Sequence, residues 1–402
     1  MEVNYVIKTL LINKRFKFSH KIDLLFDIYS LSCLLLFLKT FNFKFFWVVP
    51  LPLLLIFNLG TFFLYAINFC KLTIPPLEQL FFIGVAIILQ VISNHLDGAI
   101  GQIINILCIS TFLFIPDEEK KNIFKLILNI YTVIMLVSLI GWILIFIARI
   151  PLSKHEVQFQ HYEFYDYGIV NIRIDGQAFS RYLGMFIEPG YTGVMTVLML
   201  IANGFDLHKK QNLILFICTL FTLSLAAILL LGIYVFLTIP ISKKSRIVVV
   251  LGVFIIAFLF SYAAENKDSI IWTFVFDRVE KMLNGNITGN RFSDKFTTFY
   301  TNNITNSYRN YLFGVGSEFY NTLKLNSCGS KVYIAQFGLI NTILIVLFYL
   351  SCNIRNFSKK NIVLFIVWLA SFVDMAYPTW LCFLIIYNSG AINLKSLEMK
   401  NG

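Results

Sequence analysis

Long apolar runs, separated by short polar stretches, constrain this 402-residue chain more than any other feature. A helix needs about 20 apolar residues to cross the hydrocarbon core of a bilayer, and shorter ones are tolerated inside a bundle. Two runs, 211–241 and 361–390, are long for one span and short for two. The other candidate spans are 23–38, 45–69, 76–93, 98–116, 122–148, 182–204, 247–263 and 331–353.

Basic residues at both ends decide how often the two longer runs cross. Lys and Arg accumulate in cytoplasmic loops of membrane proteins. Basic clusters at 208–210 and 242–246 flank the first run, so both its ends lie on one side and a turn is expected near Ser224. The same reasoning makes 361–390 a pair of spans with a turn over 374–378.

The sequence therefore predicts an all-α polytopic membrane protein, a single integral membrane domain over 1–402 with about twelve transmembrane helices and both termini cytoplasmic. Only 14% of residues are charged, against roughly 25% in soluble proteins. The net charge of +11 sits in the short loops, which indicates a lipid bilayer as partner and no nucleic acid. Lys39 and Lys44 fall on the outer side and are the exception to this charge pattern.

Two segments facing outward, 149–181 and 264–330, are too long to be simple connections. Both contain mixed charges, tyrosines and other polar residues. We expect function to reside in these two large periplasmic loops.

The end of the first loop carries Arg181 and Glu188 in otherwise apolar sequence. Seven residues separate them, so two helical turns would place both on one face. Charges at a membrane boundary mark a functional site by default. Pro189 suits the first turn of the next helix and disfavours helix at Glu188 itself. An Arg–Glu pair that only orients the helix is the alternative.

The second loop contributes Arg291, Arg309 and the glycines 314 and 316. Arginine offers a planar, permanently charged fork to phosphate, and glycine allows close backbone approach. A solvated loop with isolated arginines is the alternative. The candidate substrate-binding residues are Arg173, Arg309, Gly314, Gly316 and Glu318.

A metal or cofactor is not predicted. His155, Glu156, His161 and Glu163 have a spacing that fits no standard metal site. The seven cysteines form no CxxC or Cys/His pattern. No phosphate-loop, dinucleotide-binding or catalytic-triad motif is present either.

The whole pattern resembles the bacterial O-antigen and capsule repeat-unit polymerases of the Wzy type, within the O-antigen polymerase/ligase superfamily. The layout of spans and outer loops carries the resemblance over nearly the full chain. The chain departs from the family at Asn290, which stands before Arg291 where relatives often have Gly-Arg. The local motifs are Arg181-x-x-Gly184-x-Phe186-x-Glu188-Pro189-Gly190, Gly289-Asn290-Arg291, Leu312-Phe313-Gly314-Val315-Gly316 and Ala335-Gln336-Phe337-Gly338-Leu339-Ile340.

This resemblance implies a metal-independent glycosyltransferase in the bacterial inner (cytoplasmic) membrane. A sugar hydroxyl of one lipid-linked repeat unit would attack the anomeric carbon of another, and undecaprenyl pyrophosphate would leave. Arg181 and Arg291 would bind the pyrophosphate, and Glu188 would position the acceptor or act as base. The implied partners are the undecaprenyl-pyrophosphate-linked oligosaccharide and a chain-length regulator protein.

Two other functions are alternatives to this one, and the sequence barely separates the first of them from a polymerase. An O-antigen ligase shares it but passes finished glycan to the lipid A core. A lipid-linked oligosaccharide flippase should have short outer loops and charged residues along its spans. Here charged residues within the predicted spans are few and the outer loops are long.

Overall fold

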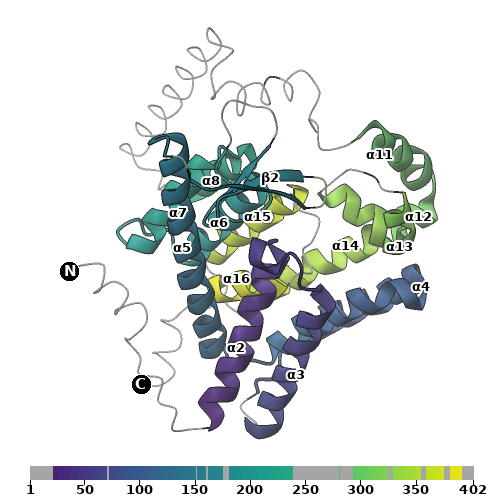
Figure 1. The fold of residues 1–402 in the computed structure, drawn as a ribbon. Coiled ribbons are helices and arrows are strands. Elements are labelled where there is room, and N and C mark those ends of the chain that lie inside the picture. Colours follow the sequence, from purple (N-terminus) through teal and green to yellow (C-terminus); the bar gives the residue numbers. More distant parts are fainter. Residues whose placement is uncertain are drawn as a thin grey trace, which may run out of the picture.

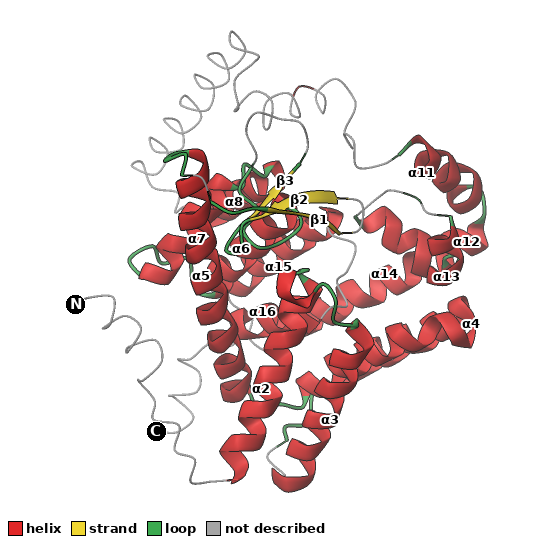
Figure 2. Ribbon diagram, in the orientation of Figure 1, coloured by secondary structure: helices red, strands yellow, loops and turns green. Residues whose placement is uncertain are grey.

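The computed structural model describes residues 21–69, 72–150, 152–159, 162–174, 181–238, 280, 293–323, 325, 329–354, 359–374 and 381–391. This part of the chain is mostly helical, as predicted, and most of its helices pack into one bundle (Figures 1 and 2). The predicted span 247–263 and the residue Arg291 lie outside it.

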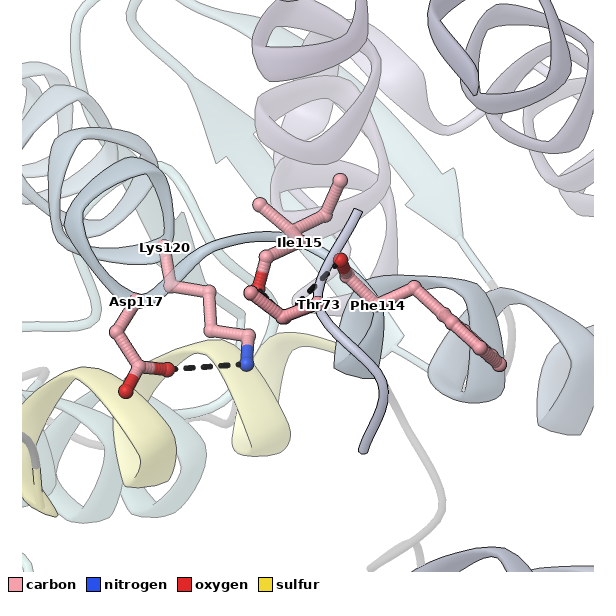
Figure 3. A network of polar contacts seen from close by, with 5 residues as sticks. All are labelled: Thr73, Phe114, Ile115, Asp117 and Lys120. Carbon is pink, nitrogen blue, oxygen red and sulfur yellow. Dashed lines mark hydrogen bonds and ion pairs between the residues drawn. The ribbon is translucent and has the colours of Figure 1, made fainter. Parts of the chain in front are cut away.

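The N-terminal part contains α2 (Lys21–Thr40), η1 (Lys44–Phe46), α3 (Leu51–Phe69), α4 (Leu77–Leu113) and α5 (Asp117–Phe146). A straight helix of the 37 residues in α4 would be about 55 Å long at 1.5 Å per residue. Yet the backbone N–H of Thr73 donates to the carbonyl of Phe114 at 2.8 Å, so the two ends of α4 are adjacent (Figure 3). The segment therefore doubles back, as the two predicted spans over 76–116 require.

The central part contains α6 (Pro189–Ala202), α7 (Lys210–Phe221) and α8 (Leu225–Thr238). A break at 222–224 separates α7 from α8 and agrees with the turn predicted near Ser224. At Gly193 of α6, an added Cβ would lie 2.8 Å from the side chain of Ala227 and 2.9 Å from that of Thr222. The absent side chain lets α6 pack tightly on this turn.

The C-terminal part contains α14 (Ser330–Ile354), α15 (Lys359–Asp374) and α16 (Leu381–Ala391). Gly338 breaks α14 with φ 84° and ψ 165°, so α14 is two helical pieces across a kink. Helix α15 packs on α6 and α8, and α16 packs on α4, α5 and α6. The turn predicted over 374–378 lies almost wholly outside the described residues, which resume at Leu381.

The first large loop departs from the all-α prediction, because it forms a three-stranded antiparallel sheet in the order β1-β2-β3. The strands are β1 (His155–Phe159), β2 (Tyr162–Asp166) and β3 (Asn171–Arg173). His155 pairs with Asp166, and Phe164 pairs with Arg173. The aromatic residues of this stretch favour strands.

The described part of the second large loop is helical. It contains α11 (Asp294–Phe299), the π-helical turn η4 (Tyr300–Thr305), α12 (Tyr308–Phe313) and α13 (Ser317–Thr322). Phe296, Ile304 and Tyr320 form a small core with Val332 and Ala335 of α14. We call residues 293–323 the helical unit.

Polar contacts gather one set of helix ends around the sheet. The Lys44 ammonium lies 2.5 Å from Asp166 Oδ1. The backbone N–H of Lys44 donates to the carbonyl of Met185, and that of Tyr182 donates to the carbonyl of Phe221. Trp142 near the C-terminal end of α5 packs on Phe221 at the end of α7, with ring centroids 5.4 Å apart. The C-terminal ends of α2, α5 and α7 and the N-terminal end of α6 thus lie together. We call this the sheet end of the bundle.

Other helix ends meet at the opposite end of α5. Gln211 at the start of α7 donates to Asn129 Oδ1 of α5 at 2.5 Å. The Lys360 ammonium at the start of α15 donates to the carbonyl of Ala202, the last residue of α6, at 3.4 Å. We call this the lysine end. In the predicted topology, successive spans cross in opposite directions. That alternation would bring the same helix ends together on each side.

The two lysines that broke the predicted charge pattern have specific partners. Lys39 Nζ donates to the carbonyls of Phe46 and Trp47 at 2.9 and 3.3 Å. Lys44 pairs with Asp166 and its side chain is only 5% exposed. Because both ammonium groups are engaged within the fold, they weigh little as orientation signals at the sheet end.

Within the described residues, two helices are long and apolar enough to cross a membrane, Asp117–Phe146 and Ser330–Cys352. Six shorter apolar helices accompany them. Helix α3 contains no charged residue, and its exposed large apolar side chains are Leu51, Leu53, Ile56, Phe57, Phe63, Leu64 and Ile67. A surface of this kind marks an interaction site with an apolar environment or a partner.

Candidate functional site

The segment 181–188 carries the two charged residues that the sequence singles out at the end of the first loop. It is irregular, with Gly184 at φ +67°, so the prediction that two helical turns align Arg181 and Glu188 is wrong. Both side chains are partly exposed. Both residues belong to the described chain, and no ion pair joins them. This geometry does not support the alternative of a simple helix-orienting pair.

Backbone and side-chain hydrogen bonds hold the segment in place. The N–H of Asn171 on β3 donates to the carbonyl of Gly184 at 2.9 Å. Tyr182 is fully buried and its hydroxyl donates to the carbonyl of Met135 at 2.8 Å, with Ser138 Oγ 2.7 Å away. The bond from β3 satisfies the Gly184 carbonyl, which a helix would otherwise satisfy internally, and the Tyr182 hydroxyl attaches the segment to α5.

Glu188 lies directly before α6, in an extended conformation with φ −146° and ψ 131°. Pro189 is the first helical residue, so the predicted break at this position is confirmed. Within the described part of the chain, the Glu188 carboxylate has no hydrogen bond or ion pair. An added Cβ at Gly190 would stand 3.4 Å from Glu188 Oε1, so this glycine leaves room for the carboxylate. A partly exposed carboxylate without an internal partner is available to accept a proton.

The sheet brings Arg173 to the same region. Residues paired across an antiparallel sheet point to one face, so Arg173 shares a face with Phe164 and Asn171 shares it with Asp166. Phe164 packs with Leu183 and Ile187 of the irregular segment. This face is therefore turned toward the bundle, and it places Arg173 on the side of the sheet where segment 181–188 lies.

The other candidate residues lie on the helical unit. Arg309 is exposed on α12, and Glu318 is in α13. Gly314 and Gly316 join these two helices with φ +77° and +88°. The N–H of Val315 donates to the carbonyl of Ala335 at 2.9 Å, and that of Gly316 donates to Gln336 at 3.0 Å.

Two glycines make this docking possible. An added Cβ at Gly314 would overlap the carbonyl of Gln336, and one at Gly338 would overlap the carbonyl of Leu312. The two backbones therefore approach each other reciprocally. The role of Gly314 and Gly316 in the structure is to seat the helical unit on the kink of α14. No contact with a substrate is required to explain them.

The candidate residues therefore fall into two groups held by different helices. Arg173, Arg181 and Glu188 lie at the sheet end against α5 and α6. Arg309 and Glu318 lie on α12 and α13, which pack on α14 and α4. The sheet and α11 both occupy the upper half of Figure 1. Arg291 lies outside the described residues, so it is assigned to neither group.

Two features near the site were missed from the sequence. The Lys44–Asp166 pair links positions 122 residues apart, and no local sequence pattern predicts it. Asn171 is fully buried and neither atom of its amide has a partner within the described structure. An unsatisfied buried amide is uncommon. A single asparagine in a loop rich in aromatic residues does not predict an unsatisfied buried side-chain amide.

A narrow crevice is lined by Phe41, Tyr131, Phe186, Tyr191, Thr192 and Met195. It has no enclosed space for even one water molecule, whereas pockets for small molecules are typically about 300–1,000 Å³, so it cannot enclose a sugar chain. In the described residues no group of three or more His, Cys, Asp or Glu could hold a metal ion. Metal independence stays a prediction for experiment.

Comparison with protein-family models, with curated proteins and with solved structures finds no match for this chain.

Proposed function

We propose that this chain is a membrane glycosyltransferase that polymerises undecaprenyl-pyrophosphate-linked oligosaccharide units into O-antigen or capsular polysaccharide. The observation that carries the proposal is the partly exposed, unpartnered carboxylate of Glu188 at the start of α6. It lies at the end of the bundle where Arg173 and Arg181 also lie. A carboxylate base beside arginines is what a glycosyl transfer from a pyrophosphate requires.

The reaction would proceed by displacement at a sugar carbon. Glu188 would accept the proton of a hydroxyl on the acceptor sugar. At the same time, the oxygen of that hydroxyl would form a bond to the anomeric carbon of the donor unit. The bond from that carbon to the pyrophosphate oxygen would break, and its electron pair would stay on the pyrophosphate. Arg181 and Arg291 would stabilise the charge that develops there, because the guanidinium binds two phosphate oxygens at once.

A position at the membrane boundary supports this chemistry. A lipid-linked donor keeps its polyprenyl chain in the bilayer, while its pyrophosphate and sugars stay at the headgroup level. The exposed apolar surface of α3 suits a chain surrounded by lipid, and about twelve spans are part of the proposal. The sheet end would then face the periplasm, and the lysine end the cytoplasm.

Reporter fusions test this orientation. We expect periplasmic reporters to be active near His161 and Asn303, and cytoplasmic reporters to be active near Lys210, Lys244 and Lys360. Activity of one and the same reporter at Lys210 and His161 would contradict the orientation.

Deletion of the gene tests the function. On a gel of surface glycan, a single repeat unit on the lipid core identifies a polymerase. Unligated polymer would identify the ligase instead, and absence of any repeat unit at the surface would identify a flippase. Restoration of the ladder by a plasmid copy is the control.

A further inference from the structure

Lysines on α5, on α15 and directly before α7 gather at the lysine end of the bundle. Lys121 of α5 is close enough to Lys125 and to Lys360 of α15 to be repelled by both. Lys360 is repelled in turn by Lys209, next to α7. We call Lys121, Lys125, Lys209 and Lys360 the lysine cluster. It lies at the end of the bundle opposite the candidate catalytic residues.

Lys121 differs from the other members of the cluster because it is buried. It is 8% exposed, and its ammonium nitrogen has no hydrogen-bond partner among the described residues. Lys125, Lys209 and Lys360 are exposed around it. A buried ammonium group without an acceptor is strongly disfavoured, and the nearby cations Lys125 and Lys360 increase that cost.

The carboxylates close to the cluster do not neutralise it. Asp117 and Glu118 attract Lys121, but Asp117 Oδ1 lies 3.2 Å from the ammonium of the neighbouring Lys120 (Figure 3). Glu118 is exposed to solvent. Glu119 is engaged elsewhere, because it accepts the hydroxyl of Tyr65 at 2.5 Å. The cluster keeps an excess of positive charge.

A phosphate group offers what the cluster lacks. It supplies negative charge and several acceptor oxygens to one buried and three exposed ammonium groups. The N-terminal ends of α7 and α15 lie beside it and add their positive dipole ends. In the proposed orientation this end faces the cytoplasmic leaflet, where basic pockets between helices attract anionic headgroups.

We propose that the lysine cluster binds the phosphate of an anionic lipid headgroup, with Lys121 as the buried donor. The proposal depends on the membrane orientation but not on glycosyl transfer. Its test needs no sugar substrate, so its failure and the failure of the proposed function are distinguishable.

The test titrates the full-length protein, purified in a neutral detergent, with phosphatidylglycerol, and follows bound lipid by native mass spectrometry. Phosphatidylcholine and inorganic phosphate are titrated separately. We expect phosphatidylglycerol to bind in preference to phosphatidylcholine. Lys121→Met keeps the apolar stem and should weaken the apparent affinity about tenfold, the loss that one charge-assisted hydrogen bond corresponds to. Lys359→Met removes an exposed charge beside the cluster and should leave the affinity unchanged.

The melting temperature provides an independent reading. Lys121→Met removes an unpaired buried charge, so without lipid its melting temperature should equal or exceed that of the wild type. Added phosphatidylglycerol should raise the wild-type value only. If Lys121→Met does not fold, Lys360→Met takes its place with the same expectation for lipid affinity. Equal lipid affinity in wild type and variant would overturn the site, and competition by inorganic phosphate at similar concentration would overturn a lipid as its source.

Discussion

The sheet of residues 155–173 and the helical unit of residues 293–323 both extend from the bundle, but different contacts hold them. The sheet is fixed by side chains, through the Lys44–Asp166 pair and through Trp47, whose ring stacks on Phe159 at 4.4 Å. The helical unit shares a small side-chain core with α14, but it is also fixed by a close backbone contact, the reciprocal approach of Gly314 and Gly338.

This difference indicates which positions tolerate substitution. A side-chain contact can be rebuilt from other residues of similar size and charge, since cores tolerate substitution that keeps volume and pattern. A backbone contact at φ above zero accepts only glycine without strain. We therefore expect substitutions to have their largest effect on the helical unit.

The substitution with the largest expected effect on stability is Gly338→Ala. Gly338 occupies a backbone region that is essentially restricted to glycine, which costs about 1–3 kcal/mol for other residues. The new methyl group would also overlap the Leu312 carbonyl. We expect a loss of about 4 kcal/mol in all, measured by chemical unfolding in detergent. Gly84→Ala is the control, because its Cβ would meet nothing within 4 Å. Equal unfolding midpoints for the two variants would show that the backbone contact at Gly338 does not contribute to stability.

A smaller effect is expected at the sheet. Asp166→Asn would leave the buried Lys44 ammonium without its counter-charge, and breaking a buried pair costs about 3–5 kcal/mol. Asp166 is 29% exposed, so we expect the lower limit of about 3 kcal/mol. Faster proteolysis within 150–180 would report it. The double variant Lys44→Met with Asp166→Asn should recover part of the loss, and Glu156→Gln on exposed β1 should change nothing. A harmless Asp166→Asn would show that stacking of Trp47 alone holds the sheet.

The smallest effect is expected for Tyr182→Phe. The variant loses the hydroxyl that bonds to Met135 and Ser138 but keeps the ring in its place. One neutral hydrogen bond contributes about 1 kcal/mol. A double-mutant cycle with Ser138→Ala should give a non-additive result, because the two residues are in contact. Additive losses would mean that the hydroxyl bonds to the backbone only.

Local residue chemistry made part of this fold predictable. Pro189 can open a helix but cannot follow a helical residue easily, and α6 begins there with Glu188 extended. The break between α7 and α8 falls at Ser224, where the run was too long for one span. Basic residues near 120, 209 and 360 meet at one end, as their shared orientation predicted.

Contacts between distant residues explain what the sequence did not predict. Residues 181–188 have a helical spacing of charges, but β3 and α5 bind their backbone and side chains instead. Val157, Phe159, Tyr162 and Phe164 alternate as a strand does, although the loop was not interpreted so. The kink at Gly338 depends on the approach of Leu312, which no local pattern contains.

The most direct test of the central claim measures chain growth by purified protein on lipid-linked repeat units. Loss of one charge-stabilising donor typically lowers the rate by a factor of about 10²–10³. We predict this loss for Arg181→Ala and for Arg291→Ala at normal membrane abundance, with partial recovery by Lys, which keeps the charge without the planar fork. Glu188→Gln should lose the rate as well, because it keeps size but cannot accept the proton. Full-length polymer from both Arg181→Ala and Arg291→Ala would contradict the site, and full activity of Glu188→Gln would contradict the base.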